Sequence, residues 1–498
     1  MRTLVPARFI ALGMLISFCS ARGQDLPPSR NAEPDQPVKA KRPPNVTRSL
    51  LGDALIRAGY ESVKLIRDRK TWQLFLNCTA NGKAICLSVD TGTSRTCIGN
   101  EPAKALQLTA TGSGTLAAGG SELLSVKTAR IQAFGVGDLP KIAKDVFIVD
   151  DSAIRALAKE AGHRIKDGEL GTDWFAQHLC VLDFADDTLY YLDPAKQGEL
   201  GKRPANHPAA DNKDDEVKGS LVGSAMIRSG FGFIKAARDK NTAELFVNCT
   251  ANGTDLCLKL DTGATLTGIS QDTAKALKLT PKDAPFRMAM TGSAISNVRV
   301  AQIEDMRMGE LRLPRTTVLV FDYSAGRNLA KQEGGIVPDG LLGASWLYYC
   351  AAVIDFGHDV LYYFPSMLKR QLTLLAGNWQ ATKVQRFGFV ETADKTKKWR
   401  LKVENEWLEW QDESTWRYAF GVNQGYPYCQ IDFLAGSSNA ADQEKKMVGI
   451  YEFDETNNRL TLCISMYQDE TSRPTKLESG KGSNVVLIEY EKVQEKQR

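Results

Sequence analysis

The hydrophobic positions of this chain fall in short runs that alternate with turn residues, a pattern typical of β-strands. Two apolar runs, residues 74–78 and 85–89, are separated by Asn81-Gly82, and the same dipeptide returns at Asn252-Gly253. Asn-Gly between such runs predicts a hairpin because both turn residues adopt positive φ. We therefore expect mainly β units, with a short helix over residues 46–60 before the first strand and another helix near residues 152–160.

A duplication organises most of the chain. Residues 46–60 reappear as 217–231, and the offset of 171 residues holds through residues 77–92 and 248–263, where 11 of 16 positions are identical. Identity at this level indicates duplication and not coincidence. Both copies close with similar motifs, residues 167–174 and 339–346, where the offset has grown by one residue.

The predicted organisation places two lobes between an N-terminal leader and a third domain. The two lobes, residues 46–195 and 219–368, are joined by a solvated linker over residues 196–218, which is rich in Pro, Gly, Asn, Asp and Lys. A Pro-rich tether precedes the lobes, and a region of different composition follows them. The remaining boundaries are 1–23 for a signal peptide, 24–45 for the tether and 372–498 for the last domain.

The N-terminus resembles a secretory signal peptide. Arg2 and Arg8 precede an apolar run over residues 9–18, and small or polar residues follow it. The run is too short to span a bilayer as a stable helix. We therefore expect an exported protein, periplasmic or secreted, without an integral membrane segment after signal removal. Of the ten cysteines, Cys19 would leave with the signal, so the odd remainder contains at least one thiol unpaired within the chain.

Composition excludes several classes of partner. The net charge is +4 with 24% charged residues, and dense Lys/Arg blocks interleaved with aromatic residues are absent from the sequence, so we expect no nucleic acid partner. The four histidines are scattered without ligand spacing, which predicts no metal site. Gly112-Ser113-Gly114 does not continue as a dinucleotide fingerprint, and we expect no cofactor.

The chemistry that the repeats favour depends on two triplets. Asp90-Thr91-Gly92 and Asp261-Thr262-Gly263 each end a hydrophobic run. Glycine lets the backbone approach a carboxylate closely, while threonine can bond to the opposite loop. Two carboxylates about 3 Å apart cannot both ionise, so they share a proton. The ionised member can take a proton from water while the protonated member polarises a carbonyl.

Each repeat resembles a retropepsin-like (retroviral-type) aspartic protease domain. The resemblance is carried by the Asn-Gly hairpin, the strand that leads into Asp-Thr-Gly, and the later Gly-x-Leu-Gly at residues 168–171 and 340–343. Because both lobes lie on one chain, as in pepsin-like enzymes, the resemblance implies two tandem β lobes related by a pseudo-twofold axis. It also implies Asp90 and Asp261 as the catalytic dyad, with Thr91, Gly92, Thr262 and Gly263 as supporting residues.

The sequence departs from the family pattern at a residue expected to lie beneath the dyad and in the flaps expected to cover it. Glu169 stands where the family has an apolar residue, whereas Leu341 fits. The charge is either a surface substitution or a disturbance of the support beneath Asp90, where any impairment of the site would begin. The candidate flaps, residues 111–120 and 288–296, lack the tyrosine of pepsin-like enzymes; glycines in the first would suit a retroviral-type flap. The dyad could also form between chains.

The cysteines near the first hairpin admit a geometric test. A two-residue turn sets Cys78 opposite Ile85 and points Cys78 and Cys86 to different faces, which opposes a disulfide within the hairpin. Pairing of one of them with Cys180 or Cys350, or burial as thiols, stays open. Further along, Cys429 and Cys463 lie on predicted strands separated by a third, beyond disulfide reach.

The last domain reads as many short strands, which predicts an antiparallel sandwich or closed barrel. Gly377-Asn378-Trp379, residues 448–451, 460–463 and 473–477 together resemble a lipocalin-like domain that recurs in planctomycete-type bacteria. Such a small barrel can hold an apolar ligand, although a core filled by side chains is the simpler alternative.

The resulting hypothesis is an exported aspartic endopeptidase, a hydrolase that acts on a peptide or protein substrate. The alternative is a catalytically inactive protein that binds a peptide or partner on an aspartic protease scaffold, because fold alone does not establish function.

Overall fold

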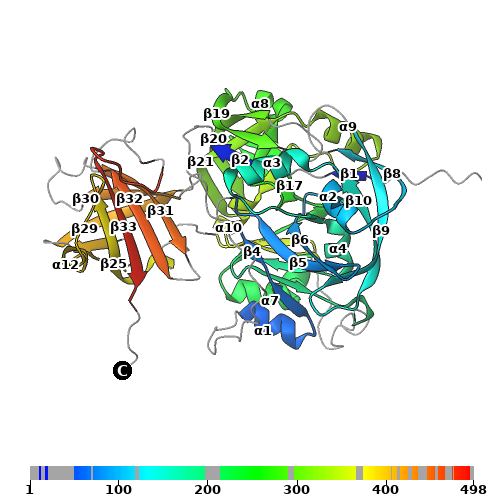
Figure 1. Ribbon diagram of the computed structural model, residues 1–498, viewed down its shortest axis with the longest axis horizontal. Coiled ribbons are helices and arrows are strands. Elements are labelled where there is room, and N and C mark those ends of the chain that lie inside the picture. The colour runs from blue at the N-terminus through cyan, green and yellow to red at the C-terminus, as the bar shows by residue number, and fades with distance from the viewer. Residues whose placement is uncertain are drawn as a thin grey trace, which may run out of the picture. The chain divides into compact units, whose positions relative to one another are not determined.

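The computed structural model divides the chain into two compact units, Met1–Pro365 and Ser366–Arg498. The first unit contains both repeats and is built mainly from β-strands (Figure 1). The structure describes residues 10–12, 17–20, 50–68, 71–117, 123–196, 213–289, 296–365, 374–404, 407–411, 415–423, 429–435, 446–454, 458–465, 474 and 476–493.

The first lobe is a twisted sheet that folds back on itself, because β9 pairs with both β8 and β5. The sheet order is β8-β9-β10-β7-β11-β6-β5-β4. Its strands and helices are β4 (Ile66–Arg67), β5 (Leu74–Ala80), β6 (Lys83–Val89), β7 (Cys97–Gly99), α2 (Asn100–Ala105), β8 (Ala110–Ala117), β9 (Leu124–Val136), β10 (Ile142–Val149), α3 (Ser152–Ala161), β11 (Gly168–Leu170) and α4 (Thr172–Gln177).

The second lobe repeats this order strand for strand, as β19-β20-β21-β18-β22-β17-β16-β15. The duplication predicted from the sequence is thus present in the strand topology. Its elements are β15 (Ala237–Arg238), β16 (Leu245–Ala251), β17 (Thr254–Asp261), β18 (Gly268–Ser270), α8 (Gln271–Ala276), β19 (Lys282–Ala289), β20 (Ser296–Met308), β21 (Leu311–Phe321), α9 (Ser324–Gln332), β22 (Gly340–Gly343) and α10 (Ala344–Tyr349).

A six-stranded sheet joins the two lobes, in the order β14-β24-β23-β12-β13-β3. Its central pair is antiparallel and places Leu182 opposite Ile354, which are corresponding residues of the two repeats. The pseudo-twofold axis therefore passes through this pair. The strands are β3 (Glu61–Lys64), β12 (Val181–Asp183), β13 (Thr188–Tyr191), β14 (Gly232–Lys235), β23 (Val353–Asp355) and β24 (Val360–Tyr363).

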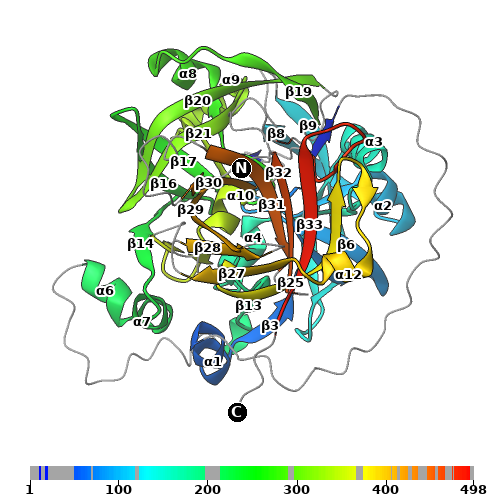
Figure 2. The same ribbon diagram turned by 90° about the vertical axis from the view of Figure 1, so that its left-hand side faces the viewer.

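Two corresponding helices, α1 (Leu50–Arg57) and α7 (Leu221–Arg228), lie side by side (Figures 1 and 2). Leu51 and Leu55 from α1 and Met226 from α7 share one buried apolar cluster with residues of the six-stranded sheet. Ser220 caps α7, since its hydroxyl accepts a hydrogen bond from the Gly223 amide at 2.9 Å. The helix expected near residues 152–160 is α3, and those expected at the start of each repeat are α1 and α7.

The turns that begin each repeat's core have the predicted chemistry. Asn81 and Gly82 have φ values of 48° and 81°, and Asn252 and Gly253 have values of 49° and 80°. Cys78 lies opposite Ile85, as predicted from a two-residue turn.

The predicted linker contains a helix that its composition did not suggest. Residues 197–212 lie outside the described part, whereas Lys213–Gly219 form α6. Acidic residues occupy its first turn and Lys218 its last, which complements the helix dipole, and Val217 is buried.

The predicted signal peptide includes two short strands, β1 (Ile10–Leu12) and β2 (Ser17–Ser20). β1 pairs with β8 and β2 pairs with β19, the outer strand of the corresponding hairpin in the other lobe. Cleavage of this segment stays a prediction. Among the described residues, the structure has no helix long and apolar enough to cross a membrane.

The second unit is an antiparallel β-barrel, because β25 pairs with both β27 and β33 and so closes the sheet (Figure 2). Cys429 and Cys463 lie on β30 and β32, with β31 between them, as expected. The elements are β25 (Gly377–Arg386), β26 (Phe389–Val390), α12 (Ala393–Thr396), β27 (Arg400–Glu404), β28 (Trp407–Gln411), β29 (Thr415–Asn423), β30 (Cys429–Ala435), β31 (Lys446–Asp454), β32 (Arg459–Ser465) and β33 (Val485–Lys492).

Buried and partly buried aromatic side chains contact one another in this unit. The rings of Trp399 and Trp410 lie 5.5 Å apart, and Trp379 packs edge-on against Phe453 at 5.8 Å. These contacts favour the filled-core alternative over an apolar ligand. The likeness to lipocalin-like domains stays a prediction.

Candidate active site

The two aspartates of the repeated triplets follow the buried strands β6 and β17. Each strand lies between a hairpin partner and a strand from the closing motif, with β6 pairing in parallel with β11 and β17 with β22. Asp90 donates its backbone amide to Leu170 O at 3.0 Å. The side chains of Asp90 and Asp261 are both fully buried. The strand framework thus fixes both aspartates in the interior of the first unit.

The glycines of the triplets bring the two carboxylates together. A methyl group added at Gly92 would overlap the Asp261 carboxylate, and one added at Gly263 would overlap the Asp90 carboxylate. Each loop therefore packs against the other lobe's carboxylate, and only glycine leaves the space for it. The structure brings together within one chain the two aspartates that the sequence predicted to meet.

The threonines form a reciprocal set of hydrogen bonds between the lobes. The Thr91 amide donates to Thr262 Oγ1 at 3.0 Å, and the Thr262 amide donates to Thr91 Oγ1 at 3.1 Å. Each hydroxyl then donates to a backbone carbonyl of the opposite lobe, Thr91 to Leu260 O at 2.9 Å and Thr262 to Val89 O at 2.6 Å. Four buried bonds thus hold the two loops in register.

Each carboxylate has one oxygen anchored by backbone. Asp90 Oδ1 accepts from the Gly92 amide at 2.8 Å, and Asp261 Oδ1 accepts from the Ala264 amide at 2.9 Å. The Oδ2 oxygens are also buried, and neither has a hydrogen-bond partner among the residues that the structure describes. A buried polar atom of this kind is a candidate for contact with a reacting group.

The two aspartates have unequal electrostatic surroundings. Burial raises the pKa of Asp90 well above its usual range, and the carboxylates of Asp261 and Glu169 raise this pKa further. Burial also raises the pKa of Asp261, but only to about 6, because the Lys259 ammonium opposes the effect. The geometry therefore supports a dyad that carries one proton from mildly acidic to neutral pH.

Glu169, which the sequence singled out as a departure, is buried beneath Asp90 and has a partner. Lys166 Nζ lies 2.9 Å from Glu169 Oε1, and Lys166 also reaches Ser88 Oγ at 3.4 Å. Both side chains are 5% exposed. The ion pair reduces the cost of burying the Glu169 carboxylate.

Three further side chains contact the triplet loops or adjoin such a contact, and their roles were not predicted from the sequence. Gln73 donates its side-chain amide across the lobe interface to Gly263 O. Lys259 Nζ donates to Gly92 O at 2.6 Å and lies 3.5 Å from Glu244 Oε1. A signal was present in the sequence, since the neutral residues Gln73 and Ser88 of the first repeat correspond to the charged residues Glu244 and Lys259 of the second.

The candidate flaps are hairpins that belong to the two lobes, one in each. The first joins β8 to β9 and the second joins β19 to β20. Their connecting residues, 118–122 and 290–295, lie outside the described part, and so do Gly119 and Gly120 of the predicted flap.

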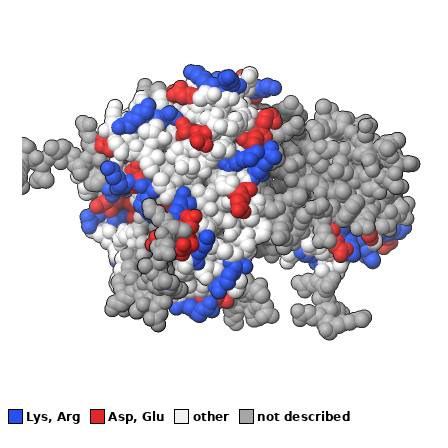
Figure 3. Space-filling model, turned by 180° about the vertical axis from the view of Figure 1, so that it is seen from behind, with Lys and Arg blue, Asp and Glu red and all other residues white. Residues whose placement is uncertain are grey.

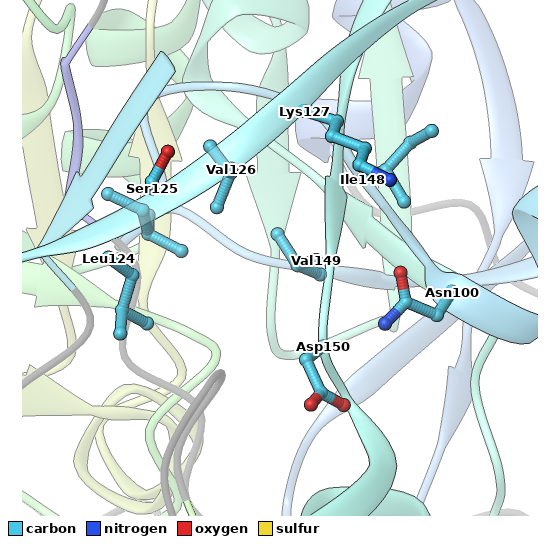
Figure 4. Close-up of a pocket in the computed structure, with 9 residues that line it drawn as sticks. Asn100, Leu124, Ser125, Val126, Lys127, Ile148, Val149 and Asp150 are labelled. Atoms are coloured by element: carbon cyan, nitrogen blue, oxygen red, sulfur yellow. The ribbon is translucent and has the colours of Figure 1, made fainter. Parts of the chain in front are cut away.

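A cavity of about 300 Å³ lies elsewhere in the first lobe (Figure 4). Its lining contains neither dyad carboxylate, so it is separate from the candidate active site. The lining residues come from β8, β9, β10 and the start of α2 and include Asn100, Leu116, Val126, Lys127, Val149 and Asp150.

Other chemistries find little support in the described residues. They contain no group of three His, Cys, Asp or Glu side chains arranged to hold a metal ion. The cysteines whose side chains are described are free thiols, so a pairing of Cys78 or Cys86 with Cys180 or Cys350 is absent among them. On the face shown in Figure 3, Lys and Arg side chains are interspersed with Asp and Glu side chains and do not gather in one basic patch.

Comparison with known proteins identifies part of the chain. A family model described as aspartyl protease matches residues 247–346, which include Asp261, Thr262 and Gly263. This stretch of the second lobe is therefore similar to aspartyl proteases. No curated protein matches the chain.

Several solved structures resemble it. A retropepsin-like aspartic protease from Rickettsia conorii is 20% identical, covering 27% of this chain and 90% of its own, with a TM-score of 0.21. An aspartic proteinase from Irpex lacteus is 14% identical, covering 62% of this chain and 98% of its own, with a TM-score of 0.32. Basic 7S globulin from soybean is 10% identical, covering 62% and 94%, with a TM-score of 0.32.

Proposed function

We propose that this chain is an exported aspartic endopeptidase that hydrolyses peptide bonds with a water molecule activated by Asp90 and Asp261. The observation that supports the proposal is the burial of both carboxylates, each against the other lobe's Asp-Thr-Gly loop. The family match to the second lobe supports the same reaction class. A peptide or protein is the proposed substrate, and the reaction needs neither metal nor cofactor.

In the proposed reaction, the ionised aspartate takes a proton from water as the water oxygen bonds to the peptide carbonyl carbon. The protonated aspartate gives its proton to the carbonyl oxygen, which forms a neutral tetrahedral diol. The diol then collapses. One hydroxyl returns its proton to the dyad, the other dyad proton passes to the amide nitrogen, and the carbon–nitrogen bond breaks. Both aspartates then regain their starting states.

The hairpins offer strand edges to which an extended substrate can bind. The outer strands β8 and β19 each pair with a short extended segment, β1 and β2. Strand edges that accept one extended segment can accept a peptide backbone through the same type of hydrogen bond. This supports binding of an extended chain near both lobes.

The test uses the full chain, produced by export from an expression host. A peptide library is incubated with the protein from pH 3 to 8, and cleavage is followed by mass spectrometry. We expect cleavage that weakens as pH falls through about 6, where Asp261 takes up a proton. Asp90→Asn and Asp261→Asn should each reduce kcat/KM by about 10²-fold or more.

Asp183→Asn is the matched control, because Asp183 is also a buried aspartate of the first lobe but lies in the six-stranded sheet. It should retain cleavage. Absence of cleavage by the unsubstituted chain at every pH, or cleavage that survives both dyad substitutions, would refute the proposal. Binding of library peptides without cleavage would favour the inactive peptide-binding alternative.

A further inference from the structure

The two Asp-Thr-Gly loops are supported from below by different chemistry. The carbonyl of Gly263 accepts a hydrogen bond from the neutral Gln73 amide of the first lobe. The carbonyl of Gly92 accepts one from the Lys259 ammonium of the second lobe at 2.6 Å. Both bonds cross the lobe interface, so each lobe supports its partner's loop, but only one of the two supports carries a charge.

The difference follows from two substitutions between the repeats. Glu244 is the counterpart of Gln73, and its carboxyl group lacks the amide NH2 with which glutamine donates to a carbonyl. Lys259, the counterpart of Ser88, supplies the missing donor: its ammonium lies between Gly92 O and Glu244 Oε1, which is 3.5 Å away. The second lobe therefore replaces a neutral donor with a buried ion pair.

This ion pair is enclosed. The side chains of Lys259 and Glu244 are 0% and 2% exposed. Burial of an ion pair costs desolvation energy that its mutual attraction only partly offsets, so the pair is weak support for stability alone. Its position beside the dyad gives it an electrostatic consequence there.

The charged and titratable groups that face Lys259 come from four parts of the first unit. They are Glu244 before β16, Tyr323 before α9, Asp261 on the same strand as Lys259, and Asp90 on the opposite loop. The cation favours the ionised form of the aspartates, and it stands among the groups that lower the pKa of Asp261.

Asp90 has other neighbours. The Glu169 carboxylate and the Asp261 carboxylate both disfavour ionisation of Asp90, while Lys166 opposes them in part. Lys166 is itself ion-paired to Glu169 at 2.9 Å. The Lys166–Glu169 pair therefore adjoins Asp90, whereas the Lys259 ammonium, bound to the Gly92 carbonyl, adjoins Asp261. Burial raises the pKa of Glu244 to about 8, so at acidic pH this partner does not cancel the Lys259 charge.

We propose that Lys259, held between Glu244 and the Gly92 carbonyl, is a positioning residue that keeps the shared proton of the dyad on Asp90 and leaves Asp261 ionised. The inference rests on the proposed function, and it assigns the roles within it. Asp261 takes the proton from water as the carbon–oxygen bond forms, and Asp90 gives its proton to the substrate carbonyl oxygen.

The test exchanges the charged pair for the residues of the first lobe. The double variant Glu244→Gln/Lys259→Ser restores a neutral amide that can donate to Gly92 O, as Gln73 does to Gly263 O. We expect the acidic limb of the kcat/KM profile to move to higher pH by about one unit, which is about tenfold lower kcat/KM at pH 5 and little change at pH 8. Lys259→Arg keeps the charge and should keep the limb near its original pH.

A spectroscopic measurement tests which aspartate holds the proton, and it requires neither enzyme activity nor the double variant. In the full chain labelled with [4-¹³C]aspartate, the carboxyl resonances of the dyad are identified by their loss in Asp90→Asn and Asp261→Asn. We expect the Asp261 resonance to titrate at lower pH than the Asp90 resonance.

The outcomes separate the two proposals. A chain that never cleaves peptide but shows Asp261 ionising first would refute the enzyme and leave the proton assignment standing. Ionisation of Asp90 first, or a double variant whose pH profile overlays that of the unsubstituted chain, would overturn the role of Lys259. A purely structural role predicts loss of folded protein or a uniform fall in rate, with the acidic limb unmoved.

Discussion

Replacement of Thr262 by valine tests the hydrogen bonds that join the two dyad loops. Valine has nearly the shape of threonine but lacks the hydroxyl. In the structure, Thr262 Oγ1 accepts from the Thr91 amide at 3.0 Å and donates to Val89 O at 2.6 Å, all within the buried interface. The substitution therefore leaves one backbone donor and one backbone acceptor of the opposite lobe without their partner.

The magnitude follows from these two groups. A buried polar group that loses its partner costs about 1–3 kcal/mol. We expect Thr262→Val to lower the free energy of unfolding of the first unit by about 2–6 kcal/mol, which is a large share of the stability of an ordinary domain. The matched control Thr262→Ser keeps the hydroxyl and loses one methyl group, so it should cost about 1 kcal/mol.

Chemical denaturation combined with hydrogen-exchange mass spectrometry measures the effect. Peptides that cover residues 88–94 and 259–265 should lose protection in Thr262→Val, and peptides from the barrel unit should serve as an unchanged internal reference. Both loops should respond because each bond spans the lobes. The prediction is refuted if the free energies of unfolding of Thr262→Val and Thr262→Ser agree within about 0.5 kcal/mol, because two buried polar groups without partners would cost more than this.

Three further predictions address the glycines, a buried carboxylate and the thiols. Gly263→Ala should abolish cleavage while the barrel unit stays folded by circular dichroism, because its methyl group would overlap the Asp90 carboxylate. Burial raises the pKa of Asp183 from 3.8 to about 7, so the folded state binds the proton more tightly and stability falls as pH rises through this window. Asp183→Asn should remove about 3 kcal/mol of that fall between urea titrations at pH 5 and pH 8. Alkylation without reductant should label Cys78 and Cys86 only after unfolding, since burial raises the pKa of both thiols; a mass deficit from a disulfide at either would contradict it.

The repeated features of the fold were predictable because their causes are local. An Asn-Gly dipeptide needs positive φ at both residues, and the structure has it at Asn81-Gly82 and again in the second repeat. The offset between repeats then places Asp90 and Asp261 at equivalent ends of β6 and β17, and two equivalent lobes on one chain can meet about a twofold axis. The dyad could therefore be proposed without any structure.

The linker helix and the buried ion pairs were not predictable on the same basis. The composition of residues 196–218 indicated solvated chain, yet α6 forms where acidic residues begin a turn and Val217 finds a buried contact. A lysine within a strand is expected to face solvent, because lysine is almost never fully buried unless it is paired. Lys259 is buried because Glu244, distant in the sequence, lies beside it, and such a contact exists only in the folded chain.

The sequence differences between the two repeats point to these ion pairs. Glu244 and Lys259 replace the neutral Gln73 and Ser88 as a complementary pair, and Lys166 and Glu169 of the first lobe correspond to the uncharged Pro338 and Leu341 of the second. Each lobe thus carries one buried ion pair, but at positions that the pseudo-twofold axis does not relate.

Because the backbone around the dyad is nearly symmetric, these side chains must supply the asymmetry on which acid–base catalysis depends. A dyad with identical surroundings would place its proton on either aspartate equally. Here the triplets contribute two equivalent carboxylates and reciprocal threonine bonds, whereas the cation at Gly92 O has no charged counterpart at Gly263 O. Under the proposed mechanism, the division of the dyad into acid and base would therefore depend on residues beneath the Asp-Thr-Gly loops that differ between the two copies.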